Sequence, residues 1–404
     1  MGDCVDREMA KSRGGPGIET EAARQAHYIK WAEIIGIQDP CGHYLGYQRI
    51  VAIYTKYVQR GVNYNNKHDL RSATVRGYAV AVNTLFKLRG FAPPADLTDP
   101  NNMTSILVNN MLREEDIARQ RAPLDNEILA ELRRSAVASK NCDSANNLLF
   151  DFVSLGRYIG PRLSEYAQTT QDKVDYHTYP SGTTVIKAFI ADDFIFYDGK
   201  RNIVKILDED SFQQVCSVKI TWRIQKNRQN GQAITLAAEV DRPEICPVRS
   251  AMRLVLRARR LNQPNDMPLG VYRAKKGKSI YLTGNKIAEL LRKAVKSIRP
   301  ETPSDDLKRY SAHSLRVWAC VLLDEAGKSP DYIKKRLRWL GDSFRMYLRD
   351  TSAIQSQHVD ALREASREVM DLINALPADV IALSISITDG TIDPDMNEYA
   401  DEMD

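Results

Sequence analysis

The sequence predicts an α+β protein that is mostly helical and contains a small antiparallel β-sheet. Apolar residues recur at helical spacing through about the first 120 residues and again after residue 245. Between residues 183 and 238 the pattern changes to short runs rich in β-branched and aromatic residues, separated by turn residues. The chain has 404 residues, of which 43% are hydrophobic and 27% charged, a composition typical of a globular protein of about two or three domains.

The cysteines and the apolar runs restrict the class of protein. Six cysteines are scattered without a C-x-x-C pair or a histidine cluster, which predicts reduced thiols in an intracellular protein and neither a disulfide framework nor a zinc site. No run of about 18 apolar residues occurs, so we expect no transmembrane helix and no membrane partner. The first residues, MGDCVDREMAKSRGGPG, lack the apolar stretch of a secretory signal.

Charge is distributed unevenly along the chain. The net charge is +5, yet the last 34 residues hold nine acidic residues and neither lysine nor arginine. Residues 1–370 are therefore basic, which favours a polyanionic partner such as nucleic acid; the alternative is an ordinary solvated surface. The acidic residues Asp389, Asp393 and Asp395 lack the spacing of a calcium loop, so we expect no metal and no other cofactor.

Four helices are expected in the first part of the chain, with Ser72 as the N-cap of the third. They cover residues 21–37, 44–61, 72–90 and 101–120. These helices predict an all-helical domain over residues 19–117, after a disordered segment (1–18) and before a linker (118–123). Exposed cations on one face of this domain could follow a phosphate backbone, and the candidate DNA contacts are Lys56, Arg60, Lys67, Arg71 and Arg76. The tyrosines between them could instead be half-buried core residues.

A second, mixed domain is expected over residues 124–375. It begins with a helix that Asp125 caps, followed by a very apolar helix at 147–160. The stretch QKNRQNGQ (225–232) predicts a hairpin tip, because Asn-Gly supplies the positive φ angles of a tight turn. Strands are expected at 183–198, 216–225, 231–238 and 279–282, and helices from residue 246 onward.

The last helices of this domain have clear boundary signals. Ser329 is expected to cap a helix with Pro330 at its first position. That helix should end at Gly341 in the left-handed conformation, and Asp342 should cap a short helix containing Tyr347. Residues 376–404 form an acidic tail.

Four residues in two spaced pairs indicate phosphate chemistry. Arg162 and Glu165 stand three residues apart, and so do His313 and Arg316, which predicts that each pair projects from one helix face. A phosphodiester under attack gains negative charge on its non-bridging oxygens, and the planar arginine fork binds two such oxygens at once. Two arginines, an imidazole that moves a proton and a phenol that attacks make a metal-free phosphoryl-transfer site.

These motifs, taken in order, resemble the tyrosine recombinases, or phage-type integrases. The chain offers GPRLSE with Arg162 and Glu165, QKNRQNG with Lys226, HSLR with His313 and Arg316, then Trp339 and Tyr347. Most bacterial members have Leu-Gly-His before the tyrosine, whereas this chain has Leu-Gly-Asp. Trp339, eight residues before Tyr347, matches the tryptophan of some eukaryotic members, and RWLGDSFRMYLR is most similar to the Crypton group of mobile elements.

The resemblance implies a role for each residue. It implies a helical core-binding domain and a catalytic domain in which Tyr347 attacks a DNA phosphate and forms a covalent 3′-phosphotyrosine. Arg162 and Arg316 would clamp the phosphate, His313 would help to deprotonate the phenol or bond the phosphate, and Lys226 would protonate the leaving 5′ oxygen. Glu165 would orient Arg162 or His313, and Trp339 would buttress the pocket. Further DNA contacts would come from Arg228, Lys334 and Lys335.

The resemblance also implies partners and a location. A site-specific recombinase of this kind acts without ATP or metal on double-stranded recombination sites, as a tetramer on two paired sites, and is often encoded by a mobile element. The tail would dock on a neighbouring subunit through residues 375–387, or else be disordered. The protein would be nuclear in a eukaryotic host and cytoplasmic otherwise.

Alternatives remain open for the residues and for the function. Arg162 with Glu165 could be a surface pair, His313 a core histidine, Trp339 and Tyr347 packing aromatics, and Lys226 a solvated hairpin lysine. The whole protein could be a DNA-binding regulator derived from a recombinase, or a type IB topoisomerase. A DNA adduct that depends on Tyr347 separates the enzymes from the regulator.

Overall fold

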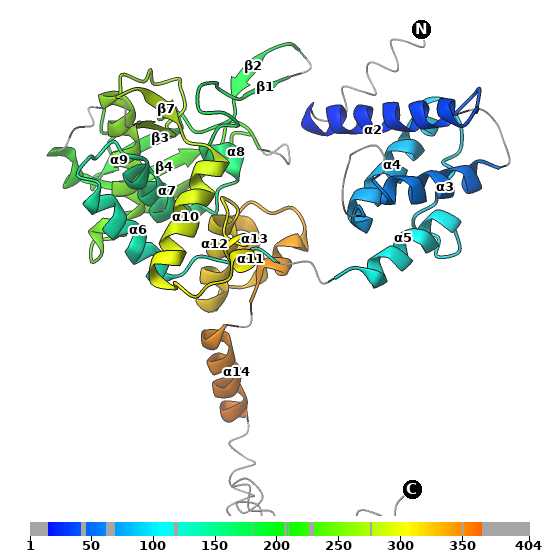
Figure 1. Cartoon of the computed structure of the whole chain (residues 1–404). Helices are drawn as coiled ribbons and strands as arrows, with labels where there is room; N and C mark the ends of the chain where they lie inside the picture. The colour runs from blue at the N-terminus through cyan, green and yellow to red at the C-terminus, as the bar shows by residue number, and fades with distance from the viewer. Residues whose placement is uncertain are drawn as a thin grey trace, which may run out of the picture. The chain divides into compact units, whose positions relative to one another are not determined.

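The computed structural model confirms a mostly helical α+β protein with small antiparallel sheets (Figure 1). The structure describes residues 15–41, 46–61, 69–116, 120–179, 181–205, 208, 210–225, 230–274, 277–349 and 351–365. Its helices are α2 (Gly15–Ile34), α3 (Tyr47–Gln59), α4 (Ser72–Leu88), α5 (Met103–Glu114), α6 (Asn126–Ala138), α7 (Ala145–Ile159), α8 (Leu163–Tyr166), α9 (Pro247–Arg260), α10 (Gly284–Ile298), α11 (Ser304–Leu307), α12 (Ser314–Glu325), α13 (Pro330–Arg336) and α14 (Ser352–Ala365). Its strands are β1 (Tyr176–Thr178), β2 (Thr184–Ile186), β3 (Phe194–Asp198), β4 (Val215–Thr221), β5 (Ala233–Ala237), β6 (Val271–Arg273) and β7 (Ser279–Tyr281).

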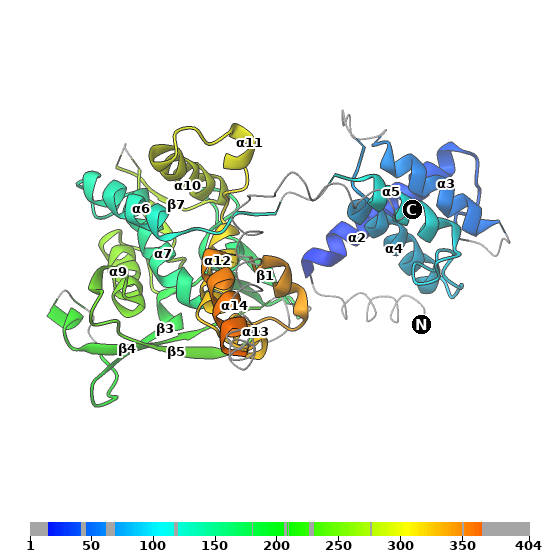
Figure 2. The ribbon, with the colours of Figure 1, turned by 90° about the horizontal axis from the view of Figure 1, so that it is seen from below.

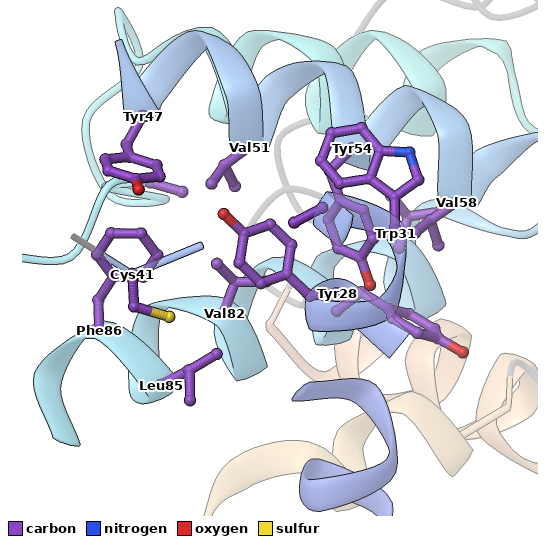
Figure 3. Packing of buried hydrophobic residues seen from close by; sticks show 14 of the residues in the cluster. Tyr28, Trp31, Cys41, Tyr47, Val51, Tyr54, Val58, Val82, Leu85 and Phe86 are labelled. Atoms are coloured by element: carbon purple, nitrogen blue, oxygen red, sulfur yellow. The ribbon is translucent and has the colours of Figure 1, made fainter. Parts of the chain in front are cut away.

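Helices α2 to α5 form a helical group around an aromatic core. Figure 3 shows the rings of Tyr28, Trp31 and Tyr54 packed together, with Tyr28 and Tyr54 edge to face at 5.0 Å between ring centroids. Buried aromatic rings contribute large apolar areas, so these side chains are core residues. Helices α2 to α5 occupy the four segments that were expected to be helical.

The expected N-cap of α4 is wrong. The N-cap is Arg71, and Ser72 is the first helical residue, with its backbone N–H donating to the carboxylate of Glu115. A carboxylate from elsewhere in the group thus satisfies one of the free N–H groups in the first turn of α4.

The middle of the chain packs helices against a three-stranded sheet. The strand order is β3-β4-β5, all antiparallel, with Phe194 opposite Ile220 and Ile220 opposite Ile234. Helix α9 packs on this sheet, α7 on α9, α6 on α7 and α10 on α6 (Figure 2). Three of the four expected strands contribute to this sheet, the first of them only over Phe194–Asp198. The fourth, expected at 279–282, is β7, and the short pairs β1–β2 and β6–β7 form two small sheets.

The predicted N-cap of α6 is confirmed, and the predicted Asn-Gly turn is partly present. The Asp125 carboxylate accepts from the Ile128 N–H at 2.9 Å, as expected of the N-cap of α6. In the hairpin between β4 and β5, Gly231 has a positive φ of 82°, whereas Asn230 is not among the non-glycine residues with positive φ. Asn230 instead accepts the Gln225 N–H with its side-chain oxygen at 2.7 Å, so only half of the expected Asn-Gly turn is present.

A buried ion cluster joins α7 to α9. The Asp151 carboxylate, 2% exposed, accepts from the guanidinium groups of both Arg253 and Arg257. Arg257 is also only 2% exposed, so both charges of that pair are removed from water. Such a pair is costly to break, because the remaining charge stays buried without compensation.

Replacing Asp151 by Ala is therefore expected to lower the free energy of unfolding by about 3–5 kcal/mol. Urea denaturation followed by circular dichroism would measure it. Asp305→Ala, which removes the exposed partner of Lys308, is the matched control and should change stability far less. Equal losses of unfolding free energy in both variants would show that the buried cluster contributes no more to stability than the exposed ion pair.

The chain divides into two compact units, residues 1–316 and residues 317–404. The second unit holds most of α12, then α13, the 3₁₀ helix η4 (Asp342–Tyr347) and α14. Its core consists of Ala319, Cys320, Ile333, Leu337 and Phe344. The expected disordered N-terminus up to residue 14, residues 118–119 of the expected linker and the acidic tail lie outside the described residues. Residues 15–18, which were also expected to be disordered, belong to α2.

The boundary signals of this unit are partly correct. Ser329 caps α13 by accepting the Tyr332 N–H at 3.3 Å, with Pro330 at the first position, as expected. However, α13 ends at Arg336, and the left-handed residue is Arg338, with φ 58°, whereas Gly341 has φ −116°. Asp342 is the first residue of η4 and makes no cap; its carboxylate pairs with Lys334 at 2.9 Å.

Candidate active site

The GPRLSEY segment forms a tight corner after α7. Gly160 ends the helix with φ 50°, a left-handed conformation that glycine adopts without strain. Arg162 is then the N-cap of α8, and its backbone N–H donates to Glu165 Oε2 at 3.0 Å. The Arg162 guanidinium Nη1 also pairs with Glu165 Oε1 at 3.3 Å. Because Glu165 is buried and Arg162 is half-buried, this is no exposed surface pair.

The HSLR segment meets this corner at two points. The Arg316 guanidinium, 1% exposed, donates to the Gly160 carbonyl oxygen. The Tyr166 hydroxyl, buried at the end of α8, donates to the Ala312 carbonyl oxygen at 2.9 Å. The structure therefore joins the chain segment that carries Arg162 and Glu165 to the segment that carries His313 and Arg316.

His313 does not share a helix face with Arg316 as the spacing predicted. It lies in a turn before α12, which begins at Ser314, and its carbonyl accepts the Arg316 N–H at 3.0 Å. The neighbouring Ser314 stabilises this turn, because its hydroxyl accepts the Ser311 N–H at 3.0 Å.

The surroundings of His313 disfavour its protonated form. Burial lowers the pKa of His313 below its ordinary value of 6.5, and the positive charges of Arg316 and Arg121 lower it further. Arg121 belongs to the linker region, where its Nη1 donates to the Lys308 carbonyl at 2.9 Å and the Ala122 N–H donates to the Arg309 carbonyl at 3.2 Å. A neutral imidazole can accept a proton near neutral pH. Nothing in the spacing of the motifs indicated Arg121.

This pKa shift makes stability depend on pH. Between the lowered folded pKa and 6.5, the unfolded chain binds a proton at His313 that the folded chain does not, so stability falls as pH falls below about 6.5. The slope is at most about 1.4 kcal/mol per pH unit, reduced because the ring is partly exposed. Melting temperatures between pH 8 and pH 5 should decline less in His313→Asn than in the original protein. Parallel declines would contradict the lowered pKa.

The β4–β5 hairpin reaches the Glu165 carboxylate through Trp222. The Trp222 indole Nε1–H donates to Glu165 Oε2 at 3.2 Å, and its ring is buried. Its backbone N–H donates to the Gln232 carbonyl at 2.9 Å, which closes the ladder below the hairpin tip. Lys226 and Arg228, expected in that tip, lie outside the described residues. Sequence reasoning singled out the cations of the tip and missed Trp222.

Trp339 and Tyr347 meet each other in the second unit. Their ring centroids are 5.4 Å apart with an interplanar angle of 45°, and both rings pack against the core around Phe344. Trp339 is therefore a packing aromatic, as one expectation had it. Tyr347 is half-buried at the end of η4. Its ring is packed, while part of the side chain remains accessible to solvent.

The expected DNA contacts are partly described. Lys56, Arg60, Arg71 and Arg76 are exposed in the helical group, and Lys335 is exposed on α13. Lys334 is half-buried and paired with Asp342, so it is less available than expected. Lys67 lies outside the described residues.

The described residues lack the features of two other classes of site. They contain no group of three or more His, Cys, Asp or Glu side chains that could hold a metal ion. Among the helices that the structure describes, none is both long and apolar enough to cross a membrane.

The chain is similar in structure to solved integrases and recombinases. The Tn1549 transposon integrase in complex with transposon right end DNA matches with 14% identity and a TM-score of 0.43, over 85% of this chain and 99% of that one. XerH site-specific recombinase bound to difH substrate matches with 16% identity and a TM-score of 0.43, over 87% and 79%. XerA recombinase matches with 10% identity and a TM-score of 0.32, over 88% and 95%. No protein-family model and no curated protein matches the sequence.

Proposed function

We propose that the protein is a site-specific DNA recombinase of the tyrosine recombinase kind, which cuts and rejoins DNA through a covalent 3′-phosphotyrosine. The observation that carries this proposal is the contact between the segment of Arg162 and Glu165 and the segment of His313 and Arg316, made through the Gly160 and Ala312 carbonyls. Two arginines and a histidine carried by adjoining segments suit a phosphodiester that gains charge as it is attacked.

Each residue has a role in the proposed reaction. The Tyr347 oxygen attacks the phosphorus, and its proton passes to His313 or to water. Arg162 and Arg316 bind the non-bridging oxygens and stabilise the added charge. The bond to the 5′ oxygen breaks, and Lys226 gives that oxygen its proton. Glu165 holds the Arg162 fork, and Trp339 packs beside Tyr347.

The ester keeps the energy of the broken bond, so the proposed reaction reverses without ATP or a metal ion. A 5′ hydroxyl from a second duplex attacks the phosphotyrosine and completes the strand exchange. The assembly proposed for this exchange is a tetramer on two paired sites. The chain's own residues Trp339 and Tyr347, at their spacing, favour a Crypton-like member encoded by a mobile element.

A covalent capture assay tests the proposal. The protein is incubated with a pool of nicked duplexes made from the DNA that flanks its gene. After cleavage, the short strand that carries the new 5′ hydroxyl diffuses away, and the adduct accumulates. A shifted band that survives denaturation supports the recombinase. DNA binding without an adduct favours a regulator, and an adduct with DNA relaxation but no strand exchange favours a type IB topoisomerase.

A further inference from the structure

The carboxylate of Glu165 is shared between two different elements. Its Oε2 accepts the Trp222 indole N–H at 3.2 Å and the Arg162 backbone N–H at 3.0 Å, while its Oε1 pairs with the Arg162 guanidinium at 3.3 Å. Glu165 is 4% exposed and Trp222 is 1% exposed, so water has little access to this arrangement. Each donor therefore restrains the orientation of the carboxylate.

A second contact ties the same two elements together. The Phe189 backbone N–H donates to the Glu165 carbonyl at 2.7 Å, and the Phe189 ring meets the Trp222 ring edge to face at 5.7 Å. Next to Trp222, the Arg223 guanidinium pairs with Asp193 at 2.6 Å and donates to the Ala188 carbonyl. The base of the hairpin is thus fixed to the segment that carries Phe189, and through it to Glu165.

A buried carboxylate that loses one donor turns toward those that remain. For Glu165 that turn would alter its contact with the Arg162 guanidinium, and a shift of about 1 Å at a phosphate-binding group is enough to slow catalysis strongly. A phenyl ring in place of the indole would keep an aromatic side chain at this position but would leave a small cavity, and the N–H would be lost. The effect of the lost hydrogen bond is therefore compared with that of the same truncation at another buried tryptophan.

We propose that Trp222 is a positioning residue that fixes the Arg162 guanidinium through Glu165, and that couples it to the base of the β4–β5 hairpin. This inference rests on the proposed recombinase function. It assigns Trp222 no contact with DNA and no proton to transfer.

The first test is Trp222→Phe, assayed on a nicked duplex that the original protein captures covalently. The rate of adduct formation at saturating DNA should fall roughly 10- to 100-fold, the range for a lost hydrogen bond to a charged group, while the Kd for DNA changes by less than about twofold. Trp31→Phe, a buried tryptophan of the helical group, is the matched control and should retain the rate. An unchanged rate in Trp222→Phe, or an equal fall in Trp31→Phe, would overturn the inference.

Two modified substrates distinguish the arginine from the hairpin lysine. In one, sulfur replaces the bridging 5′ oxygen, so the leaving thiolate needs no proton donor. In the other, a methyl group replaces a non-bridging oxygen, so the phosphate lacks the charge that the guanidinium binds. The defect of Trp222→Phe should persist on the sulfur substrate and shrink to within about twofold on the methyl substrate.

The opposite pattern, a defect that disappears on the sulfur substrate, would show that Trp222 acts through the hairpin tip and would overturn the inference. These outcomes differ from a failure of the proposed function itself. In that case the original protein forms no adduct with any duplex, whereas here the original protein reacts and only the variants differ.

Discussion

Replacing Tyr347 by Phe is expected to abolish the covalent DNA adduct, with the rate falling at least about 10³-fold. The substitution removes only the hydroxyl that the proposed reaction uses as nucleophile. The phenyl ring keeps its packing against Trp339, 5.4 Å away, and against the core around Phe344, so folding and DNA affinity should stay unchanged. The measurement is the capture assay with nicked duplexes, together with a binding titration and a melting curve.

Tyr332→Phe is the matched control for this experiment. Tyr332 belongs to the same unit, lies on α13 and is 44% exposed, so its hydroxyl could in principle reach DNA. It should form the adduct at the original rate. A Tyr347→Phe variant that still forms the adduct, or a Tyr332→Phe variant that loses it, would show that the wrong phenol has been assigned.

Replacing Arg316 by Ala should slow adduct formation by about 10²–10³-fold. The guanidinium is one of two proposed to stabilise the charge that develops on the phosphate, and it is already oriented by the Gly160 carbonyl. The variant should also lose stability, because Arg316 is buried and that carbonyl loses its donor. The rate is therefore measured at a temperature where circular dichroism shows the variant to be folded.

Two further variants make the interpretation specific. Arg316→Lys keeps a positive charge but lacks the planar fork, so most of the rate should still be lost. Arg134→Ala removes an arginine whose side chain is 68% exposed and paired only with Glu131, and it should react normally. If Arg316→Lys were fully active, a point charge would be enough and the clamp of the phosphate would be wrong.

The fold was predictable from the sequence where local signals decide it. The helical periodicity of α2 to α7 and the N-caps Asp125 and Ser329 depend on residues within one helical turn. The expectations for Ser72 and Gly341 failed. The Glu115 carboxylate takes the Ser72 N–H, and the left-handed residue falls on buried Arg338, beside the core residue Leu337.

The site was predictable in its residue types and only partly in its geometry. Spacing alone placed Arg162 with Glu165, and their contact is present. The contacts that join the motifs come from residues far apart in the chain, such as Trp222 with Glu165 and Arg316 with Gly160. No local sequence pattern predicts such contacts. The strands β1 and β6, of three residues each, were not predicted from the sequence.

The most direct test of the account is to identify the atom to which DNA becomes attached. The adduct from the capture assay is digested with protease and nuclease, and the modified peptide is sequenced by mass spectrometry. We expect a nucleotide joined through its 3′ phosphate to the side chain of Tyr347. A nucleotide on any other residue, or one joined through its 5′ phosphate, would contradict it.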